Sequence, residues 1–323
     1  MYIPRLLPEE LLSGYRGRLR MLNGLRDGLD VTIKLNGARL GRRNHQRCEL
    51  AFVELAAEHN ECSLYDVVMQ HSLWPFSSAV DRPRLQEEVE CVARTQSGRT
   101  EVMRAARPDA WLCGSCVKED LAFWGVSYWR RGHQLPGVLW CDKHGTALRR
   151  ASLCSIELGP PDHCLDKTED LDAETFQRCQ SNGIGQTFVG ICSDVLASAV
   201  PLTRTACARA LVEKALESGA CQRPRDVGMV LSDLARIRVP LEWRRHAFPK
   251  IDWTRGGLVK MIDAVCRVQQ YPASTAAIAF VAAIIFNSAD DALRALSEEF
   301  ADRQAPPLQP QRPFATEPPA IAS

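Results

Sequence analysis

Two short pairs of metal-binding residue types constrain this chain more than any other feature of its sequence. Two residues separate Cys113 from Cys116, two separate Cys141 from His144, and 24 residues lie between the pairs. This short spacing lets both side chains of a pair reach one ion from a tight turn, and three thiolates with one imidazole form a closed tetrahedral zinc set. We therefore expect one structural Zn²⁺ site, whose binding free energy would help to fold a small module.

Three other interpretations of this pattern stay open. Cys113 and Cys116 alone fit a thioredoxin-like redox pair, although no βαβ pattern surrounds them. His59-Asn-Glu61 together with the cysteine pair partly fits a zinc deaminase, although Leu112 stands where that pattern has a proline. The spacing can also arise by chance among buried thiols.

A second group of metal-binding residue types follows the first. Cys154, His163 and Cys164 could complete a second metal site, but nine residues between the two cysteines is a longer interval than a zinc knuckle usually has. The sequence leaves a second site open.

Most of the chain has the apolar spacing of helices, so we predict a mainly α fold. A chain of 323 residues is long enough for two or three units. We predict a helical N-terminal domain over 1–105, a zinc-binding module over 106–150, an acidic linker region over 151–200, a helical C-terminal domain over 201–303 and a disordered, proline-rich tail over 304–323.

Periodicity and capping signals predict individual N-terminal helices. One helix is expected from Leu11 to Leu22, ending at Asn23-Gly24, and a second over residues 44–58. Ser63 is expected to cap a short third helix that ends near His71.

Two helices are predicted in the C-terminal part. Val227, Val230, Leu231, Leu234 and Ile237 have helical spacing, which predicts that they share one buried face. The apolar run 276–286 has only 11 residues, so it predicts a buried helix and no membrane span.

Charge is balanced overall but not along the chain. Forty Lys and Arg against 39 Asp and Glu exclude a polycation held to nucleic acid by bulk charge. Residues 1–50, 107–150 and 203–260 are nevertheless basic, and the segments between them are acidic. Such blocks are typical of solvated faces or of surfaces for a polyanion. Candidate contacts to nucleic acid or a partner are Arg42, Arg43, Arg130 and Arg131.

Aromatic residues stand beside two of these arginines, between the cysteine pairs. Trp124, Tyr128 and Trp129 could stack on bases, or they could form the small core of the module together with Leu135. Both interpretations stay open.

The cysteine content and the N-terminal residues indicate the cellular compartment. Thirteen cysteines are about 4% of the chain, below the content of a disulfide scaffold. The first residues carry no pattern of an export signal. We expect a cytoplasmic protein without a membrane span.

The residues around the first metal pattern resemble the signature of a known family. The run Tyr128-Trp129-Arg130-Arg131-x-His133-Gln134-Leu135-Pro136-Gly137-Val138, set inside the two pairs, is similar to that of the TniQ family, which includes TnsD-type proteins of bacterial transposons. Pro8-Glu9-Glu10, His71-Ser-Leu-Trp-Pro75-Phe76 and, more loosely, Tyr271-Pro272 resemble further family motifs. Two features depart from the pattern: a second Cys-x-x-Cys knuckle is missing, and Leu112 precedes the first cysteine.

The resemblance implies a function in bacterial DNA transposition. Family members are non-catalytic adaptors for target-site selection, which connect target DNA or an RNA-guided CRISPR complex to an AAA+ ATPase. By the same resemblance, Cys113, Cys116, Cys141 and His144 match the family's zinc ligands, and a helix-turn-helix maps to residues 1–105. A homodimer is left open.

Two alternatives compete with the adaptor. A sequence-specific, zinc-containing transcription factor would use similar helical modules. A zinc-dependent enzyme would need an open metal position, which four protein ligands disfavour. The sequence contains no phosphate-binding loop, nucleophile elbow or metalloprotease motif.

Overall fold

The computed structural model describes residues 2–27, 30, 31, 34, 45–95, 102, 103, 107–151, 156, 159–198, 200–220, 230–267 and 273–297, without the side chains of 45–51. All structural statements below refer to these residues. Several residues named above lie outside them, namely Arg42, Arg43, Cys154, Val227, Tyr271, Pro272 and the tail 304–323.

Short helices form the N-terminal part, as predicted. They are α1 (Leu12–Leu22), α3 (His45–His59), α4 (Leu64–His71), α5 (Trp74–Ser77) and α6 (Gln86–Ala93). The predicted capping of α4 is confirmed, because the Ser63 hydroxyl accepts a bond from the Asp66 N–H while the Asp66 carboxylate accepts one from the Ser63 N–H. Tyr15, Phe52 and Val67 are buried in the core that these helices share.

The central module combines a small two-stranded sheet with short helices. Its elements are β1 (Ala110–Leu112), α8 (Gly114–Trp124), the 3₁₀ turn η1 (Gly132–Gln134) and β2 (Arg149–Ala151). The strands pair antiparallel, with Trp111 opposite Arg150. The chain is therefore mainly α, with this one sheet in the part that the structure describes.

The predicted acidic linker over 151–200 is wrong for much of its length. Residues there form η3 (Pro161–Lys167), α9 (Ala173–Gln180) and α10 (Gly183–Ala197). Seven of the eight acidic residues of 151–200 precede α10, whose Phe188, Ile191 and Cys192 are fully buried. Averaging the charge over the whole segment therefore concealed an apolar helix.

Seven further elements complete the C-terminal part: α11 (Arg204–Glu217), α12 (Leu231–Arg238), α13 (Leu241–Ala247), α14 (Lys260–Asp263), the 3₁₀ turn η4 (Val265–Arg267), α15 (Thr275–Ile285) and α16 (Ala289–Leu296). The buried helix predicted over 276–286 is confirmed as α15. The apolar face predicted for α12 is wrong at its end. Ile237, in the last turn of α12, is 68% exposed, whereas Leu231 and Leu234 are buried.

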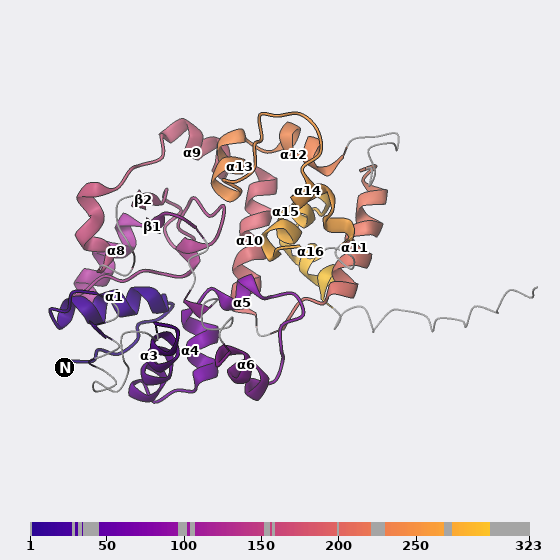
Figure 1. Cartoon of the computed structure of the whole chain (residues 1–323). Coiled ribbons are helices and arrows are strands. Elements are labelled where there is room, and N and C mark those ends of the chain that lie inside the picture. The colour runs from indigo at the N-terminus through magenta and orange to yellow at the C-terminus, as the bar shows by residue number, and fades with distance from the viewer. Residues whose placement is uncertain are drawn as a thin grey trace, which may run out of the picture.

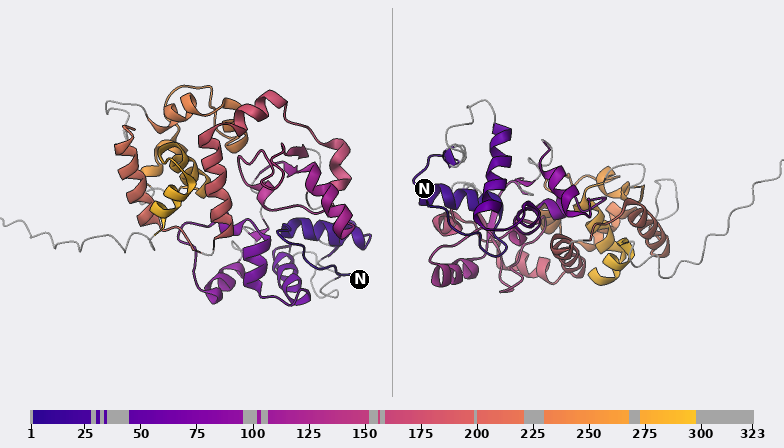
Figure 2. Two further views of the ribbon diagram at one scale, coloured as in Figure 1. Left: turned by 180° about the vertical axis from the view of Figure 1, so that it is seen from behind. Right: turned by 90° about the horizontal axis from the view of Figure 1, so that it is seen from below.

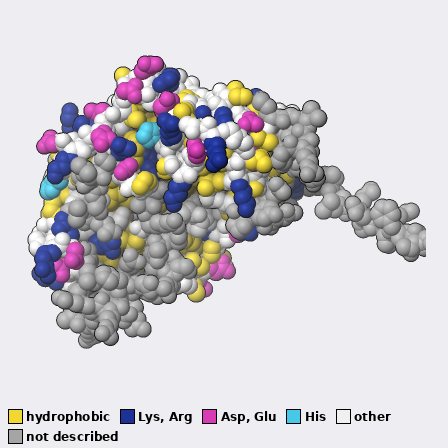
Figure 3. All heavy atoms as spheres, turned by 45° about the horizontal axis from the view of Figure 1, so that its top comes forward, with side chains coloured by type: hydrophobic (Ala, Val, Ile, Leu, Met, Phe, Trp, Pro, Cys, Tyr) yellow, Lys and Arg dark blue, Asp and Glu magenta, His cyan; other side chains and the backbone are white. Residues whose placement is uncertain are grey.

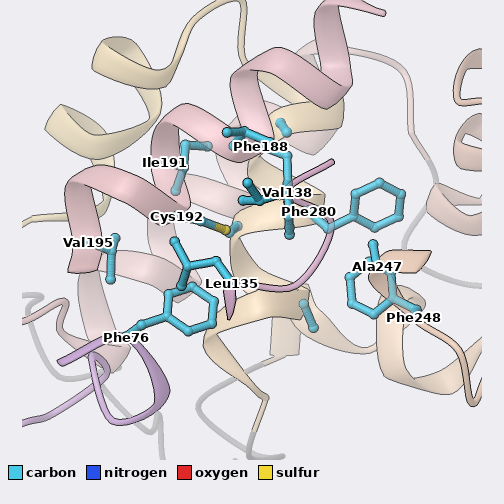
Figure 4. Close-up of a cluster of buried hydrophobic side chains, with 14 of the residues drawn as sticks. Phe76, Leu135, Val138, Phe188, Ile191, Cys192, Val195, Ala247, Phe248 and Phe280 are labelled. Carbon is cyan, nitrogen blue, oxygen red and sulfur yellow. The ribbon is translucent and has the colours of Figure 1, made fainter. Parts of the chain in front are cut away.

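One continuous core joins the central module to the C-terminal helices. Leu135 and Val138 of the module lie against α10, next to Cys192 and Val195, while Phe280 of α15 packs from the far side (Figure 4). The module therefore does not form a separate unit with a core of its own.

The central module lies on one side of α10, and α11, α15 and α16 lie on its other side (Figures 1 and 2), while α5 of the N-terminal part contacts both α10 and α15. No helix in the described ranges is both long and apolar enough to cross a membrane.

Candidate metal centre

Local structure brings the two predicted ligand pairs together. Cys113 follows β1 and is the N-cap residue of α8, and Cys116 lies in the first turn of that helix. The second pair lies in a tight turn. The Gly145 N–H donates to the Cys141 carbonyl at 2.7 Å, and the Cys141 N–H donates to the Thr146 carbonyl at 2.8 Å. Gly145 has a φ of 62°, which the turn requires and which glycine adopts without strain.

The four ligand atoms form a compact cluster. All lie within 4.8 Å of one another, and His144 Nδ1 is 3.5 Å, 3.4 Å and 3.4 Å from the sulfurs of Cys113, Cys116 and Cys141. The sulfurs of Cys116 and Cys141 are 3.6 Å apart. A tetrahedral ion with bonds of about 2.3 Å to sulfur and about 2.0 Å to nitrogen sets its ligands about 3.5 Å apart. The cluster could therefore hold a metal ion.

The surroundings of the cluster favour a thiolate at Cys113. All three cysteines are buried, and hydrogen bonds from Cys116 and Cys141 lower the pKa of the Cys113 thiol well below its usual range, whereas the same bonds to Cys113 raise the pKa of Cys116 and of Cys141. Thr146 Oγ1 lies 3.5 Å from the Cys113 sulfur and can donate to it. A metal ion binds the thiolate form, so the cluster is chemically suited to one.

A carboxylate orients the fourth ligand. His144 Nε2 lies 2.9 Å from Glu119 Oε1, and this hydrogen bond raises the pKa of His144. With Nε2–H donating to Glu119, Nδ1 is left to face the sulfurs. Metal-binding histidines commonly carry such a partner, which fixes the ring and its tautomer. Lys143 also pairs with Glu119.

The other interpretations of the cysteine pattern gain no support from the geometry. Among the described residues, the cluster contains the four predicted ligands, and neither His59 nor Glu61 joins it. His163 is exposed and lies 3.6 Å from Asp162, while Cys164 is buried and belongs to the hydrophobic core. Since Cys154 lies outside the described residues, the second site stays a prediction.

The two arginines predicted as external contacts have partners within the chain. Arg130 Nη2 lies 2.6 Å from Asp120 Oδ1, and its guanidinium lies over the Tyr128 ring at 4.5 Å. Arg131 is buried, pairs with Glu9 and donates to the Met69 carbonyl. The contacts of Arg131 hold the module to the N-terminal part, whereas those of Arg130 lie within the module.

The aromatic residues divide between core and surface. Tyr128 and Trp129 are buried with Leu135, and Trp129 Nε1 donates to the Gly159 carbonyl at 2.7 Å. Trp124 is 45% exposed, next to the still more exposed Phe123. The core interpretation therefore holds for the first two, and it is wrong for Trp124.

Gln134 has a structural role that sequence reasoning missed. Its side chain accepts from the Trp111 N–H at 3.0 Å and donates to the Trp111 carbonyl at 2.6 Å, so it completes the hydrogen bonding of β1. The one sequence signal for this role was the position of Gln134 within the run of residues 128–138 that resembles the TniQ family.

Comparison with known proteins agrees with this geometry. No curated protein matches the chain. Residues 1–148 match the TniQ family model, a segment that contains all four ligands of the cluster. The resemblance found in the sequence is thereby confirmed over residues 1–148, which match a family associated with transposition.

Proposed function

We propose that this protein is a non-catalytic adaptor for target-site selection in bacterial DNA transposition. It would act in the cytoplasm and connect target DNA, or an RNA-guided CRISPR complex, to an AAA+ transposition ATPase. The family match over residues 1–148 carries this proposal.

The metal that we propose is Zn²⁺, in a structural role. Three cysteines and one histidine at tetrahedral separations suit zinc, and four protein ligands leave no position for a reacting water. When bound, the ion would tie β1 and α8 to the turn of Cys141 and His144. Because four protein ligands would fill the coordination sphere of the ion, the cluster supports a non-catalytic protein and disfavours the zinc-dependent enzyme.

The DNA contacts that we propose lie in the N-terminal part. Helices α3 and α4 pack against each other, and we assign the helix-turn-helix of the family to this region. Arg42 and Arg43 precede α3 in the sequence and are our candidate phosphate contacts. Because Arg130 and Arg131 are engaged within the chain, we assign them a structural role instead.

A retention experiment with the full-length protein tests the adaptor. The tagged protein is incubated with an AAA+ transposition ATPase from the same host, with and without target duplex, and retained proteins are identified by mass spectrometry. The adaptor predicts that the ATPase is retained and that no turnover of nucleotide or DNA strands is found with this chain alone. Tight binding of one defined duplex without any retained ATPase would instead establish the transcription factor.

A paired substitution tests the proposed DNA contacts. Arg42→Ala/Arg43→Ala should weaken duplex binding and lower the slope of log affinity against log salt by about 2. Arg26→Ala is the control, because this exposed residue already pairs with Asp30. Equal losses of duplex affinity in the two variants would contradict the proposal that Arg42 and Arg43 contact phosphates.

A further inference from the structure

A cavity with several charged residues in its lining lies outside the metal cluster. It has a volume of about 220 Å³ and lies between the start of the central module, β2 and α13. Its charged and aromatic lining consists of Arg107, Asp109, Trp111, Arg150, Arg245 and His246. None of these residues has a role in the function proposed above.

Arg107 is a buried cation whose hydrogen bonding is incomplete. It is 7% exposed, its Nη2 donates to the Val138 carbonyl at 2.5 Å, and its guanidinium lies over the Trp111 ring at 4.9 Å. Nε and Nη1 are buried with no hydrogen-bond partner in the described structure. Burial lowers the pKa of Arg107 to about 9, so the group stays protonated at neutral pH. A buried charge without a counter-ion is costly, which implies that an anion compensates it.

The other charges around the cavity do not supply that anion. Asp109 attracts Arg107 but makes no ion pair with it; its carboxylate lies 3.8 Å from Nη1 of Arg150. Arg150 also pairs with Glu169 outside the cavity. Arg245 of α13 is exposed at the rim. Three arginines against one aspartate leave the lining with an excess of two positive charges.

His246 adds a neutral donor beside the arginines. Its ring meets Trp111 edge to face, with centroids 5.5 Å apart. Burial lowers its pKa, and the nearby charges of Arg107 and Arg150 lower it further, against an opposing effect of Asp109. A neutral imidazole offers one N–H to an oxyanion without adding charge.

We propose that this cavity binds a phosphate group. Guanidinium groups match phosphate oxygens with two parallel N–H donors, and the lining keeps an excess of positive charge after Glu169 pairs with Arg150, which suits an oxyanion. Arg107 is the buried anchor, and Arg150 and Arg245 close the site from the rim. Lys and Arg side chains gather on the face that Figure 3 turns forward, on the side of α12 and α13, so an anion can approach from solvent.

The phosphate comes either from a nucleic-acid backbone or from a free phosphate compound. The inference rests on the cavity alone and goes beyond the proposed function. If the source is DNA, it also adds a contact point to the proposed adaptor. Failure of the adaptor proposal would leave the cavity's affinity for phosphate unchanged.

Phosphate-dependent stabilisation of the full-length protein tests the site. Thermal unfolding is followed in rising inorganic phosphate, with chloride at the same ionic strength as reference, and the affinity is taken from the shift in midpoint. Wild-type protein should show a saturable shift with phosphate and none with chloride. Arg107→Met should lose the shift, and it should be less stable than wild type without phosphate because the Val138 carbonyl loses its donor, so the shift is compared with the variant's own midpoint in chloride.

Matched substitutions separate the cavity from general effects. Arg245→Gln, at the exposed rim, should fold normally and weaken phosphate binding at least tenfold. Arg238→Gln removes an exposed arginine of α12 that does not line the cavity, and Arg244→Met removes a buried arginine that lies over Trp253. Both controls should keep the shift. No phosphate-specific shift in wild type, or an unchanged shift in Arg245→Gln, would overturn the proposal.

Competition identifies the source. If inorganic phosphate and Arg245→Gln both weaken binding of a DNA duplex, the ligand is a backbone phosphate. If phosphate binds but duplex affinity is the same in wild type and Arg245→Gln, the ligand is a free phosphate compound. Both interpretations apply only if the wild-type protein shows the phosphate-specific shift in its unfolding midpoint.

Discussion

Arg131 Nε donates to Glu9 Oε2 at 2.6 Å, across 122 residues of sequence. Two backbone hydrogen bonds flank this pair: the Arg131 N–H donates to the Glu9 carbonyl, and the Leu11 N–H donates to the Trp129 carbonyl, which together place Glu10 opposite Arg130 in an antiparallel bridge. The chain segment that precedes α1 is therefore fixed to the central module by main chain and side chain together. This contact explains physically why one family match spans both regions.

We predict that Arg131→Met lowers the free energy of unfolding by about 2 kcal/mol. The substitution leaves the Met69 carbonyl without its donor and removes the pair with Glu9, which is half exposed and so contributes little itself. Urea unfolding measures the change. Arg26→Ala, which breaks an exposed pair, should change stability by less than about 0.5 kcal/mol. Equal effects of the two substitutions would contradict the role assigned to Arg131.

Removal of the metal should destabilise the protein. We expect about one zinc per chain by atomic absorption, and a chelator should lower the midpoint of unfolding, because metal binding contributes folding free energy to the core that the central module shares with the C-terminal helices. Cys116→Ser should act in the same way.

The control for this substitution is Cys91→Ser, at an exposed thiol outside the cluster. It should keep both zinc and stability. A Cys116→Ser protein with wild-type stability and zinc content would rule out the site.

Gly137 should not tolerate a side chain. It has a φ of 72°, and an added Cβ would lie 2.9 Å from both the Phe188 and Trp243 rings. Gly137→Ala should therefore cost about 1 to 2 kcal/mol for the left-handed backbone and about 1 to 3 kcal/mol for overpacking.

Gly24→Ala separates these two costs. Gly24 has nearly the same φ, 61°, but nothing lies within 4 Å of its added Cβ. We expect it to show the backbone cost alone in urea unfolding. If both alanine variants lost equal stability, close packing at Gly137 would not matter.

His133 should stay neutral well below neutral pH. Burial lowers its pKa to about 4, whereas an unfolded histidine has a pKa near 6.5. As the pH falls, the unfolded state therefore takes up a proton on this histidine before the folded state does. The stability that neutral His133 contributes is complete above about pH 6.5, and at most about 3 kcal/mol of it is lost as the pH falls toward 4.

Ring titration by NMR measures this directly, with His133→Gln to assign the signal and zinc content followed in parallel. We expect the signal to stay constant down to about pH 5. A midpoint between 6 and 7 would show that the ring is solvated.

Residue spacing was sufficient to predict which four side chains form the cluster, because a tight turn with two intervening residues works in almost any fold. Local rules also predicted the cap of α4 and the buried helix α15, since both depend on a few consecutive residues. The summed charge of a segment predicted the structure less well. It gave no indication of the apolar helix α10 within the acidic segment. It also favoured an external contact for Arg131, whose partner Glu9 is far away in sequence.

The sequence by itself therefore determined the cysteine–histidine cluster, the helical character and the family match over residues 1–148. Only the tertiary structure decided which charges are internal and which surround a cavity. Arg131 and Arg107 are both buried arginines, yet one meets a carboxylate and the other keeps unpaired donors toward a cavity. The difference lies in which distant segments pack beside each guanidinium, and long-range packing of this kind leaves no local pattern in a sequence.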